Sequence, residues 1–220
     1  MSLMRTLVKV GIGIAVAKGV GAMVNRKKQG RGQGGIGGLL GGLAGGQGSA
    51  GLQDMMSNVL GGSGRSGAGL GGLLAGQASA GFGSKLNDAF ARMGEPEEAP
   101  TADEDAMAGL MLRAMIQAAK SDGKIDDEEK QKLLASIADL GEDEQGYVTD
   151  QLSAPIDIKA LADAVPQGSE RDIYVMSVMA IDLDNNNEAQ YLHGLAEALQ
   201  LDAGTVNGIH EQLGIPSLYS

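Results

Sequence analysis

Apolar residues recur at helical spacing through the second half of the chain. Starting at Met107 they fall at i, i+3, i+4, i+7, i+8 and i+11, which places them on one face of an amphipathic helix. Thr101 and Glu104 have the spacing of a capping box at the start of this helix, and Gly141 is the predicted C-cap of the next one. Residues 173–181, IYVMSVMAI, are apolar on every side, which is typical of a central helix buried by its neighbours.

The same periodicity, with glycine and proline as stop signals, predicts the other helices of this half. They cover approximately residues 127–140, 142–152, 157–165, 169–181, 188–199 and 202–213. No stretch alternates convincingly with a period of two, so no sheet is expected. The pattern therefore predicts an all-α fold, a compact bundle of about seven helices over residues 101–220.

The N-terminal segment is apolar but carries lysines. Within residues 3–24, Lys9 and Lys18 interrupt a run that would otherwise approach the roughly 20 apolar residues of a membrane span. We expect residues 1–31 to form a basic apolar helix that associates with a membrane surface, where Arg26, Lys27, Lys28 and Arg31 meet anionic headgroups. A soluble helix or disordered arm is one alternative, and a signal peptide with its cleavage site at residues 15–17 is the other.

A glycine-rich, repetitive stretch follows. The sequence of residues 39–61 returns in residues 69–94 at an offset of 30, each time as a Gly/Leu run before one short amphipathic stretch. So little apolar surface does not offset the backbone entropy of so much glycine. We therefore predict that residues 32–100 are a largely disordered arm with transient short helices, closed by a Pro/Glu linker at residues 95–100. The arm either docks on a membrane or a partner, or acts as an extended linker.

Composition divides the chain at the same place. Of the 17 Lys/Arg and 28 Asp/Glu residues, 10 and 5 lie in residues 1–100, and 7 and 23 lie in residues 101–220. The chain has no cysteine, which excludes disulfides, zinc-thiolate sites and thiol nucleophiles. It also has no tryptophan and only 3% aromatic residues, so a base-stacking platform is not expected. Since the acidic half would repel phosphate, nucleic acid is not a predicted partner.

An acidic turn within residues 118–134, AAKSDGKIDDEEKQKLL, is the main candidate for chemistry. An EF-hand loop needs oxygen ligands at positions 1, 3 and 5, glycine at 6 and glutamate at 12. Loops that start at Asp122 or at Asp182 both fail at positions 6 and 12. Asp126 and Glu129 have the spacing of an N-cap with its reciprocal partner, so helix capping explains them sufficiently. A divalent-ion site of another kind and a catalytic carboxylate cluster remain the alternatives.

A faint internal duplication joins the two acidic turns. Glu129 and the apolar residues after it correspond to Glu188 and its followers at a constant offset of 59. Asp122 and Asp182 both lie where the preceding helix is predicted to end. The two turns are therefore expected in comparable surroundings.

The sequence lacks the residues that would support catalysis. Its two histidines, His193 and His210, lie on helices whose other residues pack, and we expect both at the surface or its boundary. The glycine runs do not contain the phosphate-binding G-x-x-x-x-G-K-[ST] pattern, and no G-x-S-x-G nucleophile motif occurs. We therefore predict a protein that is not an enzyme.

Two motifs, A-x-S/A-D-G-x-I-x-x-x-E and D-x-x-x-x-x-E-x-x-Y-L-x-x-L-A, resemble the TerB-like family of tellurite-resistance-associated domains. The resemblance covers about residues 102–214 and is closest to an uncharacterised bacterial inner-membrane branch. It implies an all-helical domain whose acidic surface binds a divalent cation, Ca²⁺, Mg²⁺ or Mn²⁺, in membrane-linked stress responses. Carried over by position, the implied metal ligands are Asp122, Asp126, Glu129, Asp182 and Glu188.

Two functional hypotheses follow. The first is a non-enzymatic protein at the bacterial inner membrane or its cytoplasmic face, tethered by residues 1–31 and binding divalent metal in an envelope or metal-stress response. The second is a soluble, cytoplasmic adaptor that binds a protein partner through its helical surface, with purely structural acidic turns.

Overall fold

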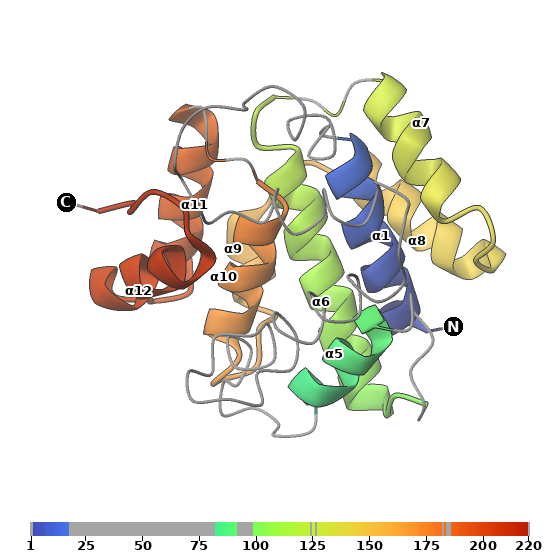
Figure 1. The fold of residues 1–220 in the computed structure, drawn as a ribbon, viewed down its shortest axis with the longest axis horizontal. Coiled ribbons are helices and arrows are strands. Elements are labelled where there is room, and N and C mark those ends of the chain that lie inside the picture. Colours follow the sequence, from blue (N-terminus) through green and yellow to red (C-terminus); the bar gives the residue numbers. More distant parts are fainter. Residues whose placement is uncertain are drawn as a thin grey trace, which may run out of the picture.

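The computed structural model describes residues 2–17, 82–91, 99–123, 125, 127–181, 183 and 186–219. Within these ranges the chain forms helices and no strand, which confirms the predicted all-α fold (Figure 1). The helices are α1 (Leu3–Ala17), α5 (Phe82–Ala91), α6 (Ala102–Ala119), α7 (Asp127–Ser136), α8 (Glu142–Ser153), α9 (Ile158–Ala162), α10 (Glu170–Met179), α11 (Asn186–Ala198) and α12 (Ala203–Leu213).

Local capping signals set several helix ends as expected. The Thr101 hydroxyl accepts from the Glu104 backbone N–H at 3.3 Å, and the Glu104 carboxylate accepts from the Thr101 N–H at 2.7 Å, which completes the predicted capping box of α6. Asp202 caps the start of α12, and Gly214 ends it in the left-handed region at φ 68°.

The prediction for Gly141 is wrong. This residue is extended and is the N-cap of α8, whereas α7 already ends at Ser136. The Gln145 side-chain amide donates to the carbonyls of Ala138 at 3.2 Å and Leu140 at 2.7 Å. A side chain of the following helix therefore satisfies carbonyls after α7 that a glycine C-cap was expected to satisfy.

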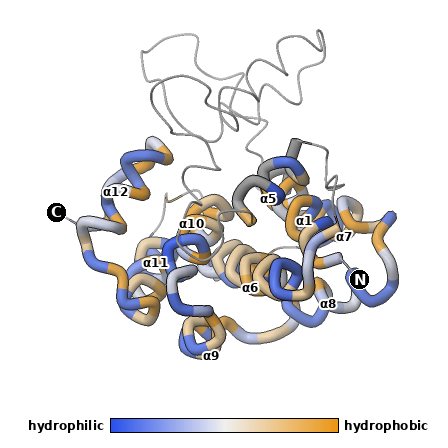
Figure 2. The backbone as a smooth tube through the Cα atoms, turned by 90° about the horizontal axis from the view of Figure 1, so that it is seen from below, coloured by the Kyte–Doolittle hydropathy of each residue, from blue (hydrophilic) through white to orange (hydrophobic). Residues whose placement is uncertain are grey.

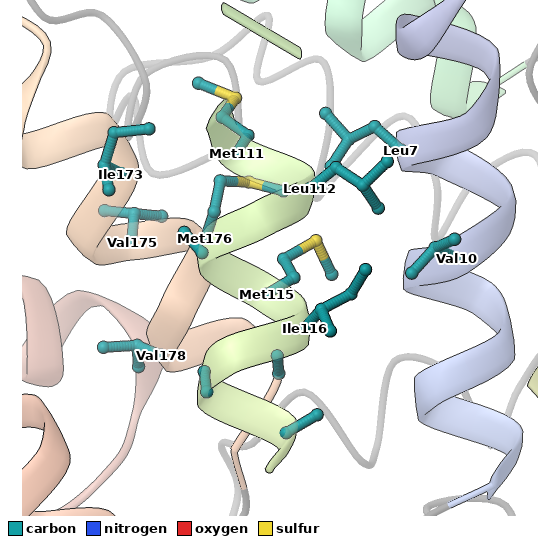
Figure 3. Close-up of a cluster of buried hydrophobic side chains, with 14 of the residues drawn as sticks. Leu7, Val10, Met111, Leu112, Met115, Ile116, Ile173, Val175, Met176 and Val178 are labelled. Carbon is teal, nitrogen blue, oxygen red and sulfur yellow. The ribbon is translucent and has the colours of Figure 1, made fainter. Parts of the chain in front are cut away.

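Helix α6 is the centre of the molecule. It lies between α1 on one side and α10 on the other, and buried methionine, leucine and isoleucine side chains fill the space between them (Figures 1 and 3). Helix α7 lies beyond α1, and α8 packs directly on α6, whereas α9, α11 and α12 lie on the α10 side (Figure 1). Figure 2 shows mainly hydrophobic residues along α6 and α10 and more hydrophilic stretches in the peripheral α8 and α12. The seven helices predicted for residues 101–220 are thus α6 to α12.

Two helices from the first half of the chain also belong to this core. Helix α1 packs on α6 and α7, and its buried residues are Met4, Thr6, Leu7, Val8, Val10, Gly13 and Ile14. Helix α5, in a region predicted to form only transient helices, buries Phe82, Leu86 and Ala89. The rest of the predicted disordered arm, apart from residues 99 and 100, lies outside the described residues. In the described part of the chain, no helix combines the length and the apolar character that crossing a membrane requires.

Candidate functional site

The structure describes two of the five candidate metal ligands in full, and their surroundings differ. Asp122 is exposed in the turn after α6, next to Gly123, whose φ of 126° needs glycine. Glu188, in the first turn of α11, is only 1% exposed. A carboxylate in the first turn of a helix is stabilised by the helix dipole. The expectation that the two turns have comparable surroundings stays a prediction, because Asp182 and the side chain of Glu129, the counterparts of Asp122 and Glu188, lie outside the described residues.

The other predicted ligands give no further geometry. Asp126, Asp182 and the side chain of Glu129 lie outside the described residues. Among the side chains that the structure does describe, no group of three or more His, Cys, Asp or Glu residues is arranged to hold a metal ion. The five-residue ligand set thus stays a prediction.

The first turn of α1 is capped by carboxylates from other helices. The backbone N–H of Ser2 donates to Glu144 Oε1 of α8 at 3.0 Å, and that of Met4 donates to Asp105 Oδ1 of α6 at 3.2 Å. Helix α1 has no acidic residue in its own first turn, so the neighbouring helices satisfy its N–H groups and its positive dipole end. The hydrogen bond from Ser2 is the main reason that the pKa of Glu144 lies below its ordinary value.

The two cations of α1 lie at one carboxylate. Lys9 Nζ is 2.5 Å and Arg5 Nη2 is 3.4 Å from Asp139 Oδ2, just beyond the end of α7. The hydrogen bond from Lys9 is the main cause of a lowered pKa at Asp139, which is 57% exposed. The cations expected to meet lipid headgroups, Arg26, Lys27, Lys28 and Arg31, lie outside the described residues. The i, i+4 spacing of Arg5 and Lys9 indicates a shared face of α1, but no sequence signal identifies a partner more than 100 residues away.

Helix α5 makes an ion pair of the same kind. Lys85 Nζ lies 3.0 Å from Glu104 Oε2, the carboxylate of the capping box of α6. Burial raises the pKa of Glu104, but hydrogen bonds from Thr101 and Lys85 outweigh it, so the net shift is downward. Both described helices of the basic first half thus contact acidic residues of the second half.

A buried histidine holds the C-terminal segment against α10. His210 Nδ1 lies 2.6 Å from the Pro216 carbonyl, and its Nε2 lies 3.0 Å from the Tyr174 hydroxyl. Since a carbonyl only accepts, Nδ1 carries the proton and Nε2 accepts from Tyr174. His210 is fully buried, contrary to the expected surface position, and burial lowers its pKa. Burial likewise raises the pKa of Tyr174. The pair is therefore a neutral, buried link between α10, α12 and the chain after Gly214.

The other histidine contacts the same C-terminal segment. His193 Nδ1 is 2.9 Å from the Tyr219 hydroxyl, and the two rings meet edge to face. The Asn207 side chain exchanges hydrogen bonds with the Tyr219 backbone, donating to its carbonyl at 2.9 Å and accepting from its N–H at 3.1 Å. Contacts from α11 and α12 thus fix this segment, and they explain both histidines structurally.

Polar residues near the end of α6 also join helices. The Gln117 amide accepts from the Asp157 N–H at 3.1 Å and donates to the Asp157 carbonyl at 3.4 Å, which fixes the start of α9. Lys120 Nζ donates to the carbonyls of Gln151 and Ala154 at the end of α8. Burial lowers the pKa of Lys120. A cation at a helix C-terminus is favourable because it opposes the dipole there.

Together these features define an all-α protein in which each of these polar contacts joins one segment of the chain to another. A family model described as "Protein of unknown function (DUF533)" matches residues 28–213, and the chain belongs to this family. It is 29% identical over 112 residues to the "Uncharacterized protein in ampR 5'region" of Yersinia enterocolitica, an alignment that covers 50% of this chain and 81% of that protein. No solved structure matches. The matched residues of the family model include α5 to α12 and begin after α1.

Proposed function

We propose that the protein is a non-enzymatic helical module that binds a protein partner through its helical surface. The observation that carries this proposal is the position of α1. Most of the apolar side chains that the structure describes in α1, over residues 3–14, are buried in the core, and its cations Arg5 and Lys9 lie at Asp139. Over these residues α1 offers a membrane neither an open apolar face nor two unpaired cations, which favours the adaptor over the membrane-tethered protein.

Further support comes from the buried polar groups. His210 with Tyr174, and Gln117 with the backbone of Asp157, join segments of the fold. Each of these side chains has its contacts within the protein, as expected for groups with a structural role. This agrees with a role in binding rather than in catalysis.

Vesicle flotation with the full chain tests this proposal. An adaptor stays in the protein fraction with both anionic phosphatidylglycerol vesicles and neutral phosphatidylcholine vesicles. Flotation with anionic vesicles alone would contradict the proposal if it is lost when Arg26, Lys27 and Lys28 are replaced by alanine. These three cations lie outside α1, so the substitutions leave the core contacts of α1 in place.

The second candidate is the membrane-associated, TerB-like protein that binds a divalent cation in an envelope or metal-stress response. The observation that favours it is Asp122, which is exposed in its turn and accessible to an ion. Its remaining ligands would be Asp126, Glu129, Asp182 and Glu188, as the family resemblance implies. Oxygen ligands of this kind suit Ca²⁺, Mg²⁺ and Mn²⁺.

Titration calorimetry tests the metal site with the full chain, because removal of residues 1–100 would also remove α1 and α5 from the core. The metal hypothesis expects heat with at least one of Ca²⁺, Mg²⁺ and Mn²⁺, and loss of that heat in the double variant Asp122→Asn, Asp182→Asn. Asp143→Asn, an exposed acidic residue of α8, is the matched control and should keep the heat. If none of the three ions gives heat, the metal hypothesis is wrong.

A further inference from the structure

Both histidines of the chain contact one short segment. We call residues 214–219, which follow α12, the C-terminal strap (Figure 1). His210 contacts it at the Pro216 carbonyl, and His193 contacts it at the Tyr219 hydroxyl. The chain has two histidines in all, and histidine is the side chain whose charge ordinarily changes between pH 5 and pH 8. Two contacts of the strap therefore depend on residues that mild acid protonates.

Neutral His210 is fully hydrogen-bonded only while the strap is closed. Its Nδ1–H donates to the Pro216 carbonyl at 2.6 Å, and its Nε2 accepts from the Tyr174 hydroxyl at 3.0 Å. Both side chains are fully buried. The strap supplies the acceptor for Nδ1–H, and a buried donor without an acceptor is costly. Neutral His210 therefore stabilises the closed strap.

Protonation of His210 removes this match. Nε2 then carries a proton of its own and donates towards the Tyr174 oxygen, so the hydroxyl proton of Tyr174 loses the acceptor that it has in the neutral pair. A buried charge and a buried unsatisfied donor both raise the free energy of the closed form. Water relieves both costs once the strap leaves the Nδ1 side of the ring.

The surroundings of His210 do not compensate a positive charge. The titratable and charged groups on the elements around the ring are Glu170, Arg171, Asp172 and Tyr174 of α10, His193 and Glu197 of α11, Glu211 of α12 and Tyr219 of the strap. Glu197 lies 3.6 Å from His193 Nε2, so it faces the other ring. Among the described residues, no carboxylate contributes to the shifted pKa of His210, which burial lowers more than the Pro216 carbonyl raises it.

The two histidines respond to protonation in different ways. His193 is half exposed, and Glu197 lies beside its Nε2, so a positive charge on His193 is both hydrated and paired. In the charged form its Nδ1 still donates to the Tyr219 oxygen. Protonated His193 thus keeps its contact with the strap, and only His210 favours release.

We propose that the C-terminal strap is an acid-sensitive switch, in which protonation of His210 releases residues 214–219 from α10 and α12 while the rest of the helical core stays folded. Besides the histidines, the strap is held by two hydrogen bonds between Asn207 and the Tyr219 backbone and by partly buried apolar side chains. A segment with so few buried contacts opens at a small cost in free energy. The switch goes beyond the proposed adaptor function and does not depend on it.

Solution NMR of the full chain between pH 8 and pH 4.5 tests the switch. The imidazole ¹⁵N signals report the charge of each histidine, and the amide and methyl signals of Ile215 and Leu218 report the position of the strap. We expect the strap signals to move towards random-coil positions with the same midpoint as His210, below about pH 6.5, while those of the buried Leu112 and Ile116 in α6 stay in place. Strap signals that keep their positions over this range, or that move only together with those of α6, would overturn the proposal.

Two variants assign the switch to one ring. His210→Gln keeps an amide donor and an acceptor but does not titrate, so its strap signals should stay in place from pH 8 to pH 4.5. His193→Gln is the matched control, because it removes the other titrating ring at the strap and should retain the wild-type transition. Loss of the transition in His193→Gln, or a wild-type transition in His210→Gln, would overturn the assignment to His210. If His210→Gln displaces the strap already at pH 8, the agreement or disagreement of the two wild-type midpoints decides the question by itself.

Discussion

Helices α1 and α10 lie on opposite sides of α6 and are both buried, but their sequences gave different expectations (Figure 3). Helix α10 was predicted as a central helix because IYVMSVMAI is apolar all round. Helix α1 was expected at a membrane, yet Leu7 and Val10 face α6 as Met176 does from the other side. Hydropathy shows that a helix needs apolar surroundings, but it does not show whether a protein core or a lipid supplies them.

The polar contacts of the two helices also differ. Helix α10 is linked to α12 by Tyr174 and His210, a neutral and buried hydrogen bond. Helix α1 is linked to the end of α7 by Lys9 and the largely exposed Asp139. Removing part of a buried hydrogen bond leaves an unsatisfied group, whereas exposed ion pairs contribute little and are screened by salt. We therefore expect that substitutions of core residues in α1 or α10 change the stability strongly, and that substitutions that remove the ion pairs of α1 change it little.

The largest effect is expected from Leu7→Ala in α1. Leu7 is fully buried, so its truncation should lower the free energy of unfolding by about 2–5 kcal/mol, as should Ile173→Ala in α10. Urea denaturation of both variants measures this. Ile156→Ala is the control, because Ile156 is 40% exposed and its truncation should change stability little. If Leu7→Ala behaves like Ile156→Ala, α1 does not contribute to the core as α10 does.

Gly13→Ala should change the free energy of unfolding by a smaller amount, and the sign of this change is informative. In an isolated or lipid-bound helix, alanine in place of glycine stabilises by about 1 kcal/mol. With α1 packed on α7, the added Cβ collides with Leu133 and Ser136, so we expect a loss of about 1–3 kcal/mol in urea denaturation. Gly146→Ala has free space around it and should stabilise α8. A gain for both variants would contradict the docking of α1.

Much of the fold was predictable because its signals are local. The periodicity after Met107, the capping box of Thr101 and Glu104, and the C-cap Gly214 depend on residues within a few positions of each other. The position of α1 was not predictable, because it depends on complementarity between residues such as Lys9 and Asp139 that are far apart in sequence. The sequence shows that the first half of the chain is basic and the second half acidic. It does not show that charged residues of the two halves contact each other within one folded core.

The candidate site shows the same limit. The matching sequence positions of Glu188 and Glu129 suggest equivalent turns, but they do not predict burial, which depends on the helices around each turn. Glu188 is buried in the structure, and its counterpart, the side chain of Glu129, lies outside the described residues. The position of His210 likewise depends on Pro216 and Tyr174, and only Pro216 lies near it in sequence.

A pH-dependent effect is expected on the α10 side of the comparison. Burial lowers the pKa of His210 in the folded protein, so the unfolded state binds a proton more readily. The contribution of neutral His210 is therefore complete above the ordinary histidine pKa of about 6.5 and is lost as pH falls through the lowered value. Urea denaturation between pH 8 and pH 5 should show a decrease in stability that is reduced in His210→Gln.

Tyr174→Phe is the control for this experiment. It removes the hydroxyl that donates to His210 but keeps the titrating ring, so it should lower stability while retaining the pH dependence. An unchanged pH dependence in His210→Gln would assign the acid sensitivity to other groups.

The smallest effect is expected from Asp139→Asn on the α1 side. The variant removes the carboxylate that Arg5 and Lys9 contact, so amide hydrogen exchange in α1 should become slightly faster. Because Lys9 lowers the pKa of Asp139, the contribution of this carboxylate is present above the ordinary Asp pKa and is lost as pH falls. High salt should also abolish the difference from wild type, since screening at 1 M reduces the Debye length to about 3 Å.

Asp163→Asn is the control for this experiment. It removes a similarly short ion pair, between Lys159 in α9 and Asp163 just after that helix, and it should leave amide hydrogen exchange in α1 unchanged. If amide hydrogen exchange in α1 becomes equally faster in both variants, the ion pairs of Arg5 and Lys9 do not hold α1 selectively. Packing alone would then keep α1 on α6, as it keeps α10.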